Sequence, residues 1–193
     1  AAARLAADQK KGRRRQAVIV FLDESGFLLQ PLNRRTWAPT GCRPQQYAWQ
    51  RHDRLSVIGS LSLSPRRRRL GVFFRVQEEN VCAPHVMRYL RQLHRQHRRP
   101  LIVVMDRLNA HRSAVRKLRE RGARWLHVEW LPGYAPDLNP IEALWSQAKF
   151  TDLANFVPDD VDHLHDAVIE AVGDLQFRPH LLRSFFQSAK LLL

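Results

Sequence analysis

Several features that define common protein classes are missing from this sequence. Its only cysteines, Cys42 and Cys82, lie far apart and form no CxxC pair, which argues against a disulfide framework and against a zinc site. The longest apolar runs, such as AVIVFL and LIVVM, are too short to span a bilayer. The basic N-terminus carries no apolar segment of the signal-peptide type. These absences predict a soluble, cytoplasmic protein.

Acidic residues are also scarce. The chain of 193 residues has 18 Asp and Glu against 32 Lys and Arg, which gives a net charge of +14 and a pI near 11.2. This excess favours a polyanionic partner, and nucleic acid first among these, although a protein can also be basic without one. The hydrophobic fraction of 45% excludes a disordered composition and suits one globular domain.

The apolar pattern predicts an α/β fold with no repeat and no second domain. We expect a basic lead-in or linker remnant over residues 1–16 and one domain over residues 17–193. Strand–helix–strand units imply parallel pairing, while an early hairpin implies antiparallel pairing, so we predict a mixed sheet with helices on both faces. Buried strands are expected at residues 17–29 (broken at ESG), 55–64, 70–76, 100–106 and 123–132, and helices at 80–99, 111–122, 140–153, 158–175 and 178–193.

Two aspartates follow apolar runs that should lie in the middle of the sheet. Asp23 ends the first run and Asp106 ends the run PLIVVMD. A carboxylate beside buried surface is costly unless it is paired or binds a cation. Ligand sites of open sheets gather at the carboxyl ends of strands. Both aspartates are therefore candidate cation ligands, whereas strand alternation and turn propensity mark Glu24 and Asp137 as non-catalytic.

A third carboxylate, Glu142, stands in the proline-rich stretch LPGYAPDLNPIEALWSQAKF. Asn139 suits a helix N-cap and Pro140 suits the first helical position, which places Glu142 third in the helix. That is the capping-box position, so Glu142 could simply bond back to the Asn139 amide. Alternatively, the stiff loop aims this carboxylate at the two aspartates. Three carboxylates on rigid elements suit two divalent cations, Mg²⁺ or Mn²⁺, beside a scissile phosphate.

Three motifs together resemble a known family. FLDESGF, VVMDRLNAHRS and LPGYAPDLNPIEALWSQAK, with WAPTG after the first, resemble the catalytic domain of mariner-type transposases, in particular the bacterial insertion sequence 630 group of DDE superfamily endonucleases. The resemblance covers roughly residues 17–153, and 35 residues separate Asp106 from Glu142. It implies a ribonuclease-H-like fold in which Asp23, Asp106 and Glu142 are the catalytic and metal-binding triad.

The resemblance also implies an activity and partners. These are metal-dependent cleavage of DNA phosphodiesters at element ends and strand transfer to target DNA, by a homodimer in the bacterial cytoplasm or nucleoid. Two departures stand out. Arg107 follows the second Asp where the family often has Asn, and no helix-turn-helix region precedes the first motif. We therefore expect a fragment, a remnant, or one product of a split frame whose upstream frame encodes the helix-turn-helix protein.

Two other functions remain open at this point. The chain could be a catalytically incompetent DNA-binding or assembly fragment of a transposase, because it lacks the end-recognition region. It could also be another ribonuclease-H-like nuclease, such as a junction resolvase, which would prefer branched DNA and transfer no strand.

Basic and aromatic side chains outside the triad are candidate DNA contacts. The arginine run is either a phosphate-binding patch or a solvated hairpin tip, and the histidine either orients a phosphate or water or begins a helix. A tryptophan beside two arginines can stack on a base. The predicted DNA-binding residues are Arg34, Arg35, Trp37, Arg66, Arg67, Arg68, Arg69, His111 and Lys149.

Overall fold

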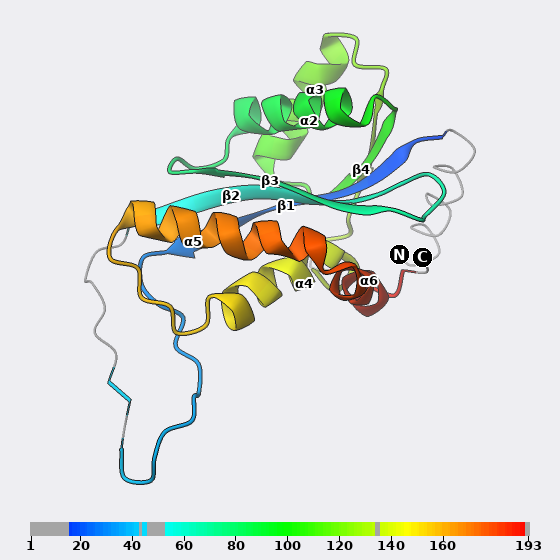
Figure 1. The fold of residues 1–193 in the computed structure, drawn as a ribbon. Helices are drawn as coiled ribbons and strands as arrows, with labels where there is room; N and C mark the ends of the chain where they lie inside the picture. The colour runs from blue at the N-terminus through cyan, green and yellow to red at the C-terminus, as the bar shows by residue number, and fades with distance from the viewer. Residues whose placement is uncertain (1–15, 43, 46–52, 134–135, 192–193) are drawn as a thin grey trace.

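The computed structural model describes residues 16–42, 44–45, 53–133 and 136–191, so residues 1–15 of the expected lead-in lie outside the described residues. One five-stranded sheet in the order β3-β2-β1-β4-β5 forms the centre of the domain (Figure 1). Its strands are β1 (Val18–Leu28), β2 (Arg54–Leu63), β3 (Leu70–Gln77), β4 (Leu101–Met105) and β5 (Leu126–Trp130).

The sheet is mixed, as the sequence predicts. β1 pairs with β2, and β2 with β3, in antiparallel fashion, while β1–β4 and β4–β5 are parallel. The antiparallel half is a meander whose second turn carries the arginine run. The parallel half is joined by helical crossovers, the usual connection between parallel strands.

The prediction that the first strand breaks at ESG is wrong. β1 continues to Leu28, because β2 pairs with it along its whole length and supplies backbone hydrogen-bond partners as far as Arg54. On its other side, β1 pairs with β4 only as far as Phe21. Asp23 therefore lies inside a strand, but just beyond the point where the neighbouring parallel strand ends.

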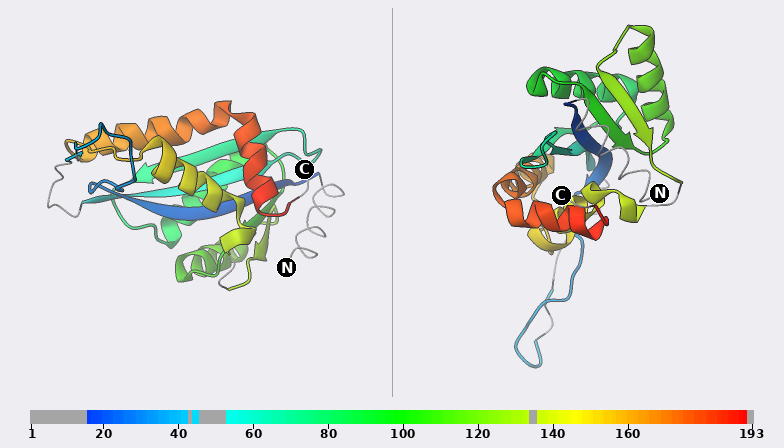
Figure 2. Two further views of the ribbon diagram at one scale, coloured as in Figure 1. Left: turned by 90° about the horizontal axis from the view of Figure 1, so that it is seen from below. Right: turned by 90° about the vertical axis from the view of Figure 1, so that its right-hand side faces the viewer.

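Helices cover both faces of the sheet (Figures 1 and 2). One helix precedes β4 and another precedes β5, and both lie on one face of the sheet. Three further helices lie on the opposite face. The helices are α2 (Ala83–His97), α3 (Asn109–Glu120), α4 (Pro140–Gln147), α5 (Val161–Asp174) and α6 (Pro179–Ser188). These elements confirm the predicted helices, with ends that differ by a few residues.

Alternation along β1 divides the core into two layers. Val18, Val20 and Leu22 pack under α2 and α3, whereas Ile19 and Phe21 pack under α4, α5 and α6. Successive side chains of a strand point to opposite faces, so one strand serves both layers. The same alternation points Asp23 and Glu24, which follow on β1, toward opposite faces of the sheet.

The region after α4 is not a continuous helix to residue 153. α4 ends at Gln147, and a π-helical turn follows over Ala148–Asp152. Such turns are rare and occur frequently at functional sites. Asp160 caps α5 by accepting a hydrogen bond from the His163 amide at 2.7 Å, as the sequence predicts.

A close contact fixes α4 against the sheet. The indole of Trp145 lies over Gly59 of β2, and a Cβ added to Gly59 would stand 2.5 Å from its ring. Gly59 is the register partner of Asp23. A glycine opposite the first aspartate therefore lets the helix that carries Glu142 approach the sheet closely.

Two further observations concern the absences noted in the sequence. Within the described part of the chain, no helix is both long and apolar enough to cross a membrane. Cys42 and Cys82 are free, exposed thiols.

We predict that Gly59→Ala lowers stability by about 1–3 kcal/mol, the usual cost of overpacking, because the rigid indole cannot yield without moving α4. Thermal unfolding measures the change. Gly26→Ala is the matched control, since nothing lies within 4 Å of the added Cβ on the same sheet. Equal stability of the two variants would contradict the close contact.

Candidate active site

Neighbouring acidic residues of β1 point to opposite faces of the sheet. Asp23 continues the alternation of the residues under α4, and Glu24 that of the residues under α3. Both side chains are partly buried. One strand thus delivers two carboxylates to two different environments.

Asp106 follows the last residue of β4, at the edge where the parallel strands end. Its Oδ1 accepts a hydrogen bond from the Leu108 amide at 3.1 Å. This local bond turns the chain into α3, which begins two residues earlier than the sequence predicts. The same oxygen bonds to His111 at 2.5 Å, so both of these contacts leave Oδ2 of Asp106 for another ligand.

Glu142 occupies the first turn of α4 and its side chain is exposed. Asn139 and Pro140 hold the predicted N-cap and first helical positions. The capping-box alternative is not observed, because the Asn139 side chain makes no capping bond and only the Glu142 backbone amide contacts Asn139, at 3.1 Å. The carboxylate of Glu142 is thus available to a ligand.

The electrostatics of Asp23 report how close these carboxylates are. Burial, and next the negative charge of Glu142, raise the pKa of Asp23 to about 7, and Glu24 and Asp106 add to the rise. Like charges raise a carboxyl pKa only when they lie near it. The charges of Glu142 and Asp106, the other two predicted triad residues, therefore reach Asp23.

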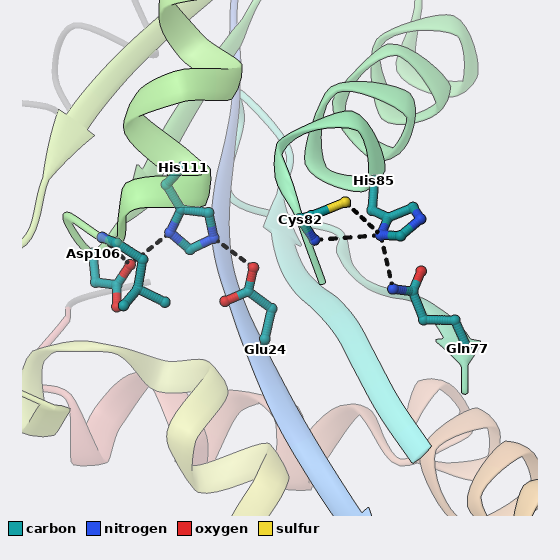
Figure 3. Close-up of polar contacts among 7 residues, drawn as sticks. Glu24, Gln77, Cys82, His85, Asp106 and His111 are labelled. Carbon is teal, nitrogen blue, oxygen red and sulfur yellow. Dashed lines mark hydrogen bonds and ion pairs between the residues drawn. The ribbon is translucent and has the colours of Figure 1, made fainter. Parts of the chain in front are cut away.

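A buried histidine bridges two of the acidic residues (Figure 3). His111 of α3 is fully buried, with Nδ1 2.5 Å from Asp106 and Nε2 2.8 Å from Glu24. Burial alone lowers the pKa of His111, but the bonds to both carboxylates outweigh burial and raise it to about 10. The imidazolium donates at both nitrogens and holds the pKa of Asp106 below its ordinary value, although burial acts in the opposite direction.

This bridge changes two interpretations of the sequence. Glu24, which alternation marks as non-catalytic, contacts His111 and through it supports Asp106. The predicted DNA contact of His111 finds no support here, because a fully buried side chain offers no surface to DNA. The signal in the sequence is the five-residue spacing of Asp106 and His111, which places the histidine in the first turn of the helix after β4.

The donor set fits divalent cations. Among the described residues, no three His, Cys, Asp or Glu side chains stand close enough together to hold a metal ion as they are placed here. Chemically, an oxygen-only set of carboxylates is what Mg²⁺ and Mn²⁺ prefer. Asp23, Asp106 and Glu142 are the residues that would hold such ions.

Lys149 joins this site from the π-helical turn. Its ammonium lies 5.2 Å from the centre of the Phe27 ring. Burial lowers the pKa of Lys149, while the charges of Glu142 and Asp23 partly offset that effect. The predicted DNA contact of Lys149 stays a prediction, and its position beside two of the three carboxylates is consistent with it.

The predicted contacts in the long loop lie on an arm. Residues 31–42 extend away from the body of the domain, and Trp37 is 100% exposed (Figure 1). The base of the arm is fastened to the site: the Arg34 amide donates to Asn155 at 2.7 Å and its guanidinium lies 5.6 Å from the Phe150 ring centre. DNA contact by Arg34, Arg35 and Trp37 stays a prediction.

The arginine run is a hairpin tip, as expected, but it lies away from the carboxylates. Leu63, just before the run, pairs with Ile19, near the start of β1, whereas Asp23 lies farther along that strand. The run is therefore at the edge where the parallel strands begin. DNA contact by Arg66, Arg67, Arg68 and Arg69 stays a prediction, and these residues do not belong to the same site as the triad.

A basic hollow that the sequence analysis did not identify adjoins Asp106. It measures about 510 Å³, begins at Arg107 next to Asp106, and is lined by four arginines, one acidic residue and two apolar ones: Arg107, Arg112, Arg116, Arg119, Glu120, Val115 and Trp130. Arg107, which replaces the Asn common in the family, thus contributes positive charge beside the second aspartate. The spacing of the arginines along α3 was the signal in the sequence that could have revealed this hollow.

The mixed five-stranded sheet with helices on both faces is the ribonuclease-H-like fold that the sequence analysis expects. Residues 18–164 match the family described as DDE superfamily endonuclease. The match covers most of the chain, and the chain belongs to this family.

Solved structures share the fold. The Mos1 mariner paired end complex with Mn matches with a TM-score of 0.66 and 18% identity over 98% of this chain and 58% of that chain. The Mos1 strand transfer complex gives 0.58 and 18% over 100% and 60%, and the Mos1 paired end complex with Mg gives 0.55 and 20% over 100% and 61%. This chain thus spans about three fifths of the length of these proteins. No curated protein sequence matches it.

We predict that Asp23→Asn stabilises the protein at alkaline pH when divalent cations are chelated. The pKa of Asp23 rises from 3.8 to about 7 on folding, so the charged carboxylate destabilises the native state increasingly as the pH rises through this interval. The advantage of the variant should grow by about 1–3 kcal/mol between pH 5 and pH 8, since one pKa unit corresponds to about 1.4 kcal/mol.

Thermal unfolding at the two pH values measures this difference, with Glu170→Gln on the exposed side of α5 as the control. Mg²⁺ should raise the melting temperature of the wild type more than that of Asp23→Asn. If Asp23→Asn were less stable than the wild type at pH 8 in chelator, the charged form of Asp23 would not destabilise the native state, and the prediction would be wrong.

We predict that His111→Ala costs about 3 kcal/mol at neutral pH, because it leaves Asp106 and Glu24 without their shared cation. Folding raises the pKa of His111 from 6.5 to about 10, so the stabilisation is fully present below pH 6.5 and is lost as the pH rises through about 10. Denaturant unfolding across this range measures it. A constant difference between variant and wild type up to pH 11 would argue against the charged bridge.

Proposed function

We propose that this chain is the catalytic domain of a mariner-type transposase. It hydrolyses a DNA phosphodiester at an element end and then joins the freed 3′-hydroxyl to target DNA by a second in-line displacement. The family of the chain, the fold shared with the Mos1 complexes and the motifs noted above support this function.

The observation that carries the proposal concerns Asp23, Asp106 and Glu142: the helix that carries Glu142 packs closely against Gly59, the register partner of Asp23. The three acidic residues come from a strand, a strand end and a helix that are distant in the sequence, and the packing of α4 over Gly59 brings the third toward the first. A partly buried carboxylate such as Asp23 is costly near other negative charges, which supports a cationic ligand beside it.

The residues of the chain divide the work. Asp23, Asp106 and Glu142 bind two Mg²⁺ or Mn²⁺ ions. When bound, these ions neutralise the scissile phosphate and make the attacking oxygen a stronger nucleophile. His111, held by Glu24, keeps Asp106 ionised and oriented. Lys149 faces a non-bridging phosphate oxygen.

The substrate and partners follow from the same proposal. Double-stranded DNA is the substrate, at element ends and at the target. The arm and the hollow that begins at Arg107 would provide exposed arginines for its backbone. We propose further that the protein acts as a homodimer in the bacterial cytoplasm or nucleoid. An upstream-frame helix-turn-helix protein would supply recognition of element ends.

We predict that the protein nicks supercoiled plasmid in Mn²⁺ and that Glu142→Gln reduces the nicking rate by at least about 100-fold, the scale expected when a group that stabilises the transition state is lost. Conversion of supercoiled to open-circular DNA measures the rate. Glu170→Gln makes the same chemical change on the exposed side of α5 and should nick like the wild type.

Equal nicking by wild type and Glu142→Gln would mean that a contaminating nuclease is responsible. Failure of the pure, folded protein to nick in either metal would favour the assembly-fragment alternative. A preference for branched DNA without strand transfer would favour a resolvase.

A further inference from the structure

A second basic surface lies apart from the candidate active site. A groove of about 680 Å³ runs between α2 and the C-terminal half of α3. These two helices cover the face of the sheet opposite α4, α5 and α6 (Figures 1 and 2). None of the triad residues, and neither Glu24 nor His111, is among the residues that line it.

The groove carries charge of one sign only. Five cationic side chains line it and no acidic one does; they are Arg88, Arg91, Arg95, Lys117 and Arg121. All five are exposed, and none forms an ion pair with a residue that the structure describes. Elsewhere α3 does pair its charges, as Arg116 and Glu120 at 4.0 Å show.

Covering the core does not by itself explain this charge. Apolar side chains, Met87 and Leu118 among them, form the floor, and arginine stems commonly lie over such surface. That role is met equally well by glutamate or glutamine, and exposed helices usually mix both signs because i,i+4 pairs stabilise them. α2 has no acidic residue from Ala83 to His97. Repulsion among unneutralised cations is therefore retained along this helix.

The dimensions and the aromatic content of the groove indicate the kind of anion. A hollow of about 680 Å³ with its cations spread over two helices is too large for one phosphate ion and suits a polymer with regularly spaced charges. Its one aromatic residue, Trp125, already stacks on His94 with the ring centres 4.3 Å apart. Phosphate contact is thus favoured over stacking on unpaired bases.

We infer that the groove between α2 and α3 binds the sugar–phosphate backbone of duplex DNA, separately from the segment that enters the active site. The inference rests on the DNA substrate of the proposed function, but it does not require catalysis. The domain then holds a second stretch of duplex on the face opposite α4, which adds affinity without contributing to the chemistry.

The test compares two triple variants that lower the net charge equally. Arg91→Gln, Arg95→Gln and Lys117→Gln are combined in the groove variant. Arg75→Gln, Arg183→Gln and Lys190→Gln, at exposed positions on β3 and at the end of the chain, form the control. Binding of a fluorescent 30-base-pair duplex is measured in EDTA, so that no cleavage occurs, across a series of salt concentrations.

We expect the groove variant to bind the duplex at least about tenfold more weakly at 0.15 M salt. The slope of log affinity against log salt concentration should be smaller in magnitude by about 2–3, because each lost phosphate contact removes about one unit. The control should lose much less. The groove variant should still nick plasmid at saturating protein. This result would separate the inference from the proposed activity, because loss of nicking in Glu142→Gln tests the triad and not the groove.

Three results would overturn the inference. The first is equal weakening in both triple variants, which would indicate a general effect of net charge. The second is unchanged duplex affinity in a groove variant whose melting temperature matches the wild type. The third is unchanged duplex affinity together with lost binding of a poly-glutamate peptide, which would assign the groove to an acidic protein. Single variants Arg91→Gln and Lys117→Gln, each expected to reduce the slope by about one unit, replace the triple variant if it does not fold.

Discussion

Mutual repulsion of carboxylates at one edge of the sheet is the constraint on which the other features of this domain depend. Burial first, and then the charges of Glu142, Glu24 and Asp106, raise the pKa of Asp23, so its charged form costs free energy in the fold. Core packing supplies the compensation: two apolar layers share β1, and Trp145 lies directly against Gly59. The fold is stable enough to hold charges together that would separate in a flexible chain.

The domain manages its charges differently on the two faces of β1. Toward α3, Glu24 and Asp106 share the imidazolium of His111, so that side is neutralised from within the protein. Toward α4, the partly buried Lys149 is near Asp23 and Glu142, and the proposed cations would neutralise these carboxylates further. The alternation of a single strand therefore directs Glu24 toward His111 and Asp23 toward α4.

Positive charge gathers on several separate surfaces of the domain. The hollow beside Asp106, the base of the arm and the groove between α2 and α3 each gather arginines on exposed surface. On α2 and α3 the apolar faces pack against the sheet, so the arginines of these helices lie on the outer faces. The net charge of +14 is thus distributed over separate basic surfaces, which can contact different stretches of one polyanion.

The sequence by itself indicated most of the strands and helices and the family, and it singled out three carboxylates whose catalytic role stays a prediction. Hydrophobic periodicity fixed the strands and helices, and the motifs around Asp23, Asp106 and Glu142 pointed to the family, because local spacing encodes both. Only the tertiary structure decided the rest. β2 extended β1 through ESG by pairing with it, the bridge made Glu24 a partner of His111, and register placed the arginine run at the opposite edge. These outcomes depend on contacts between residues that are distant in the chain, and local spacing does not contain them.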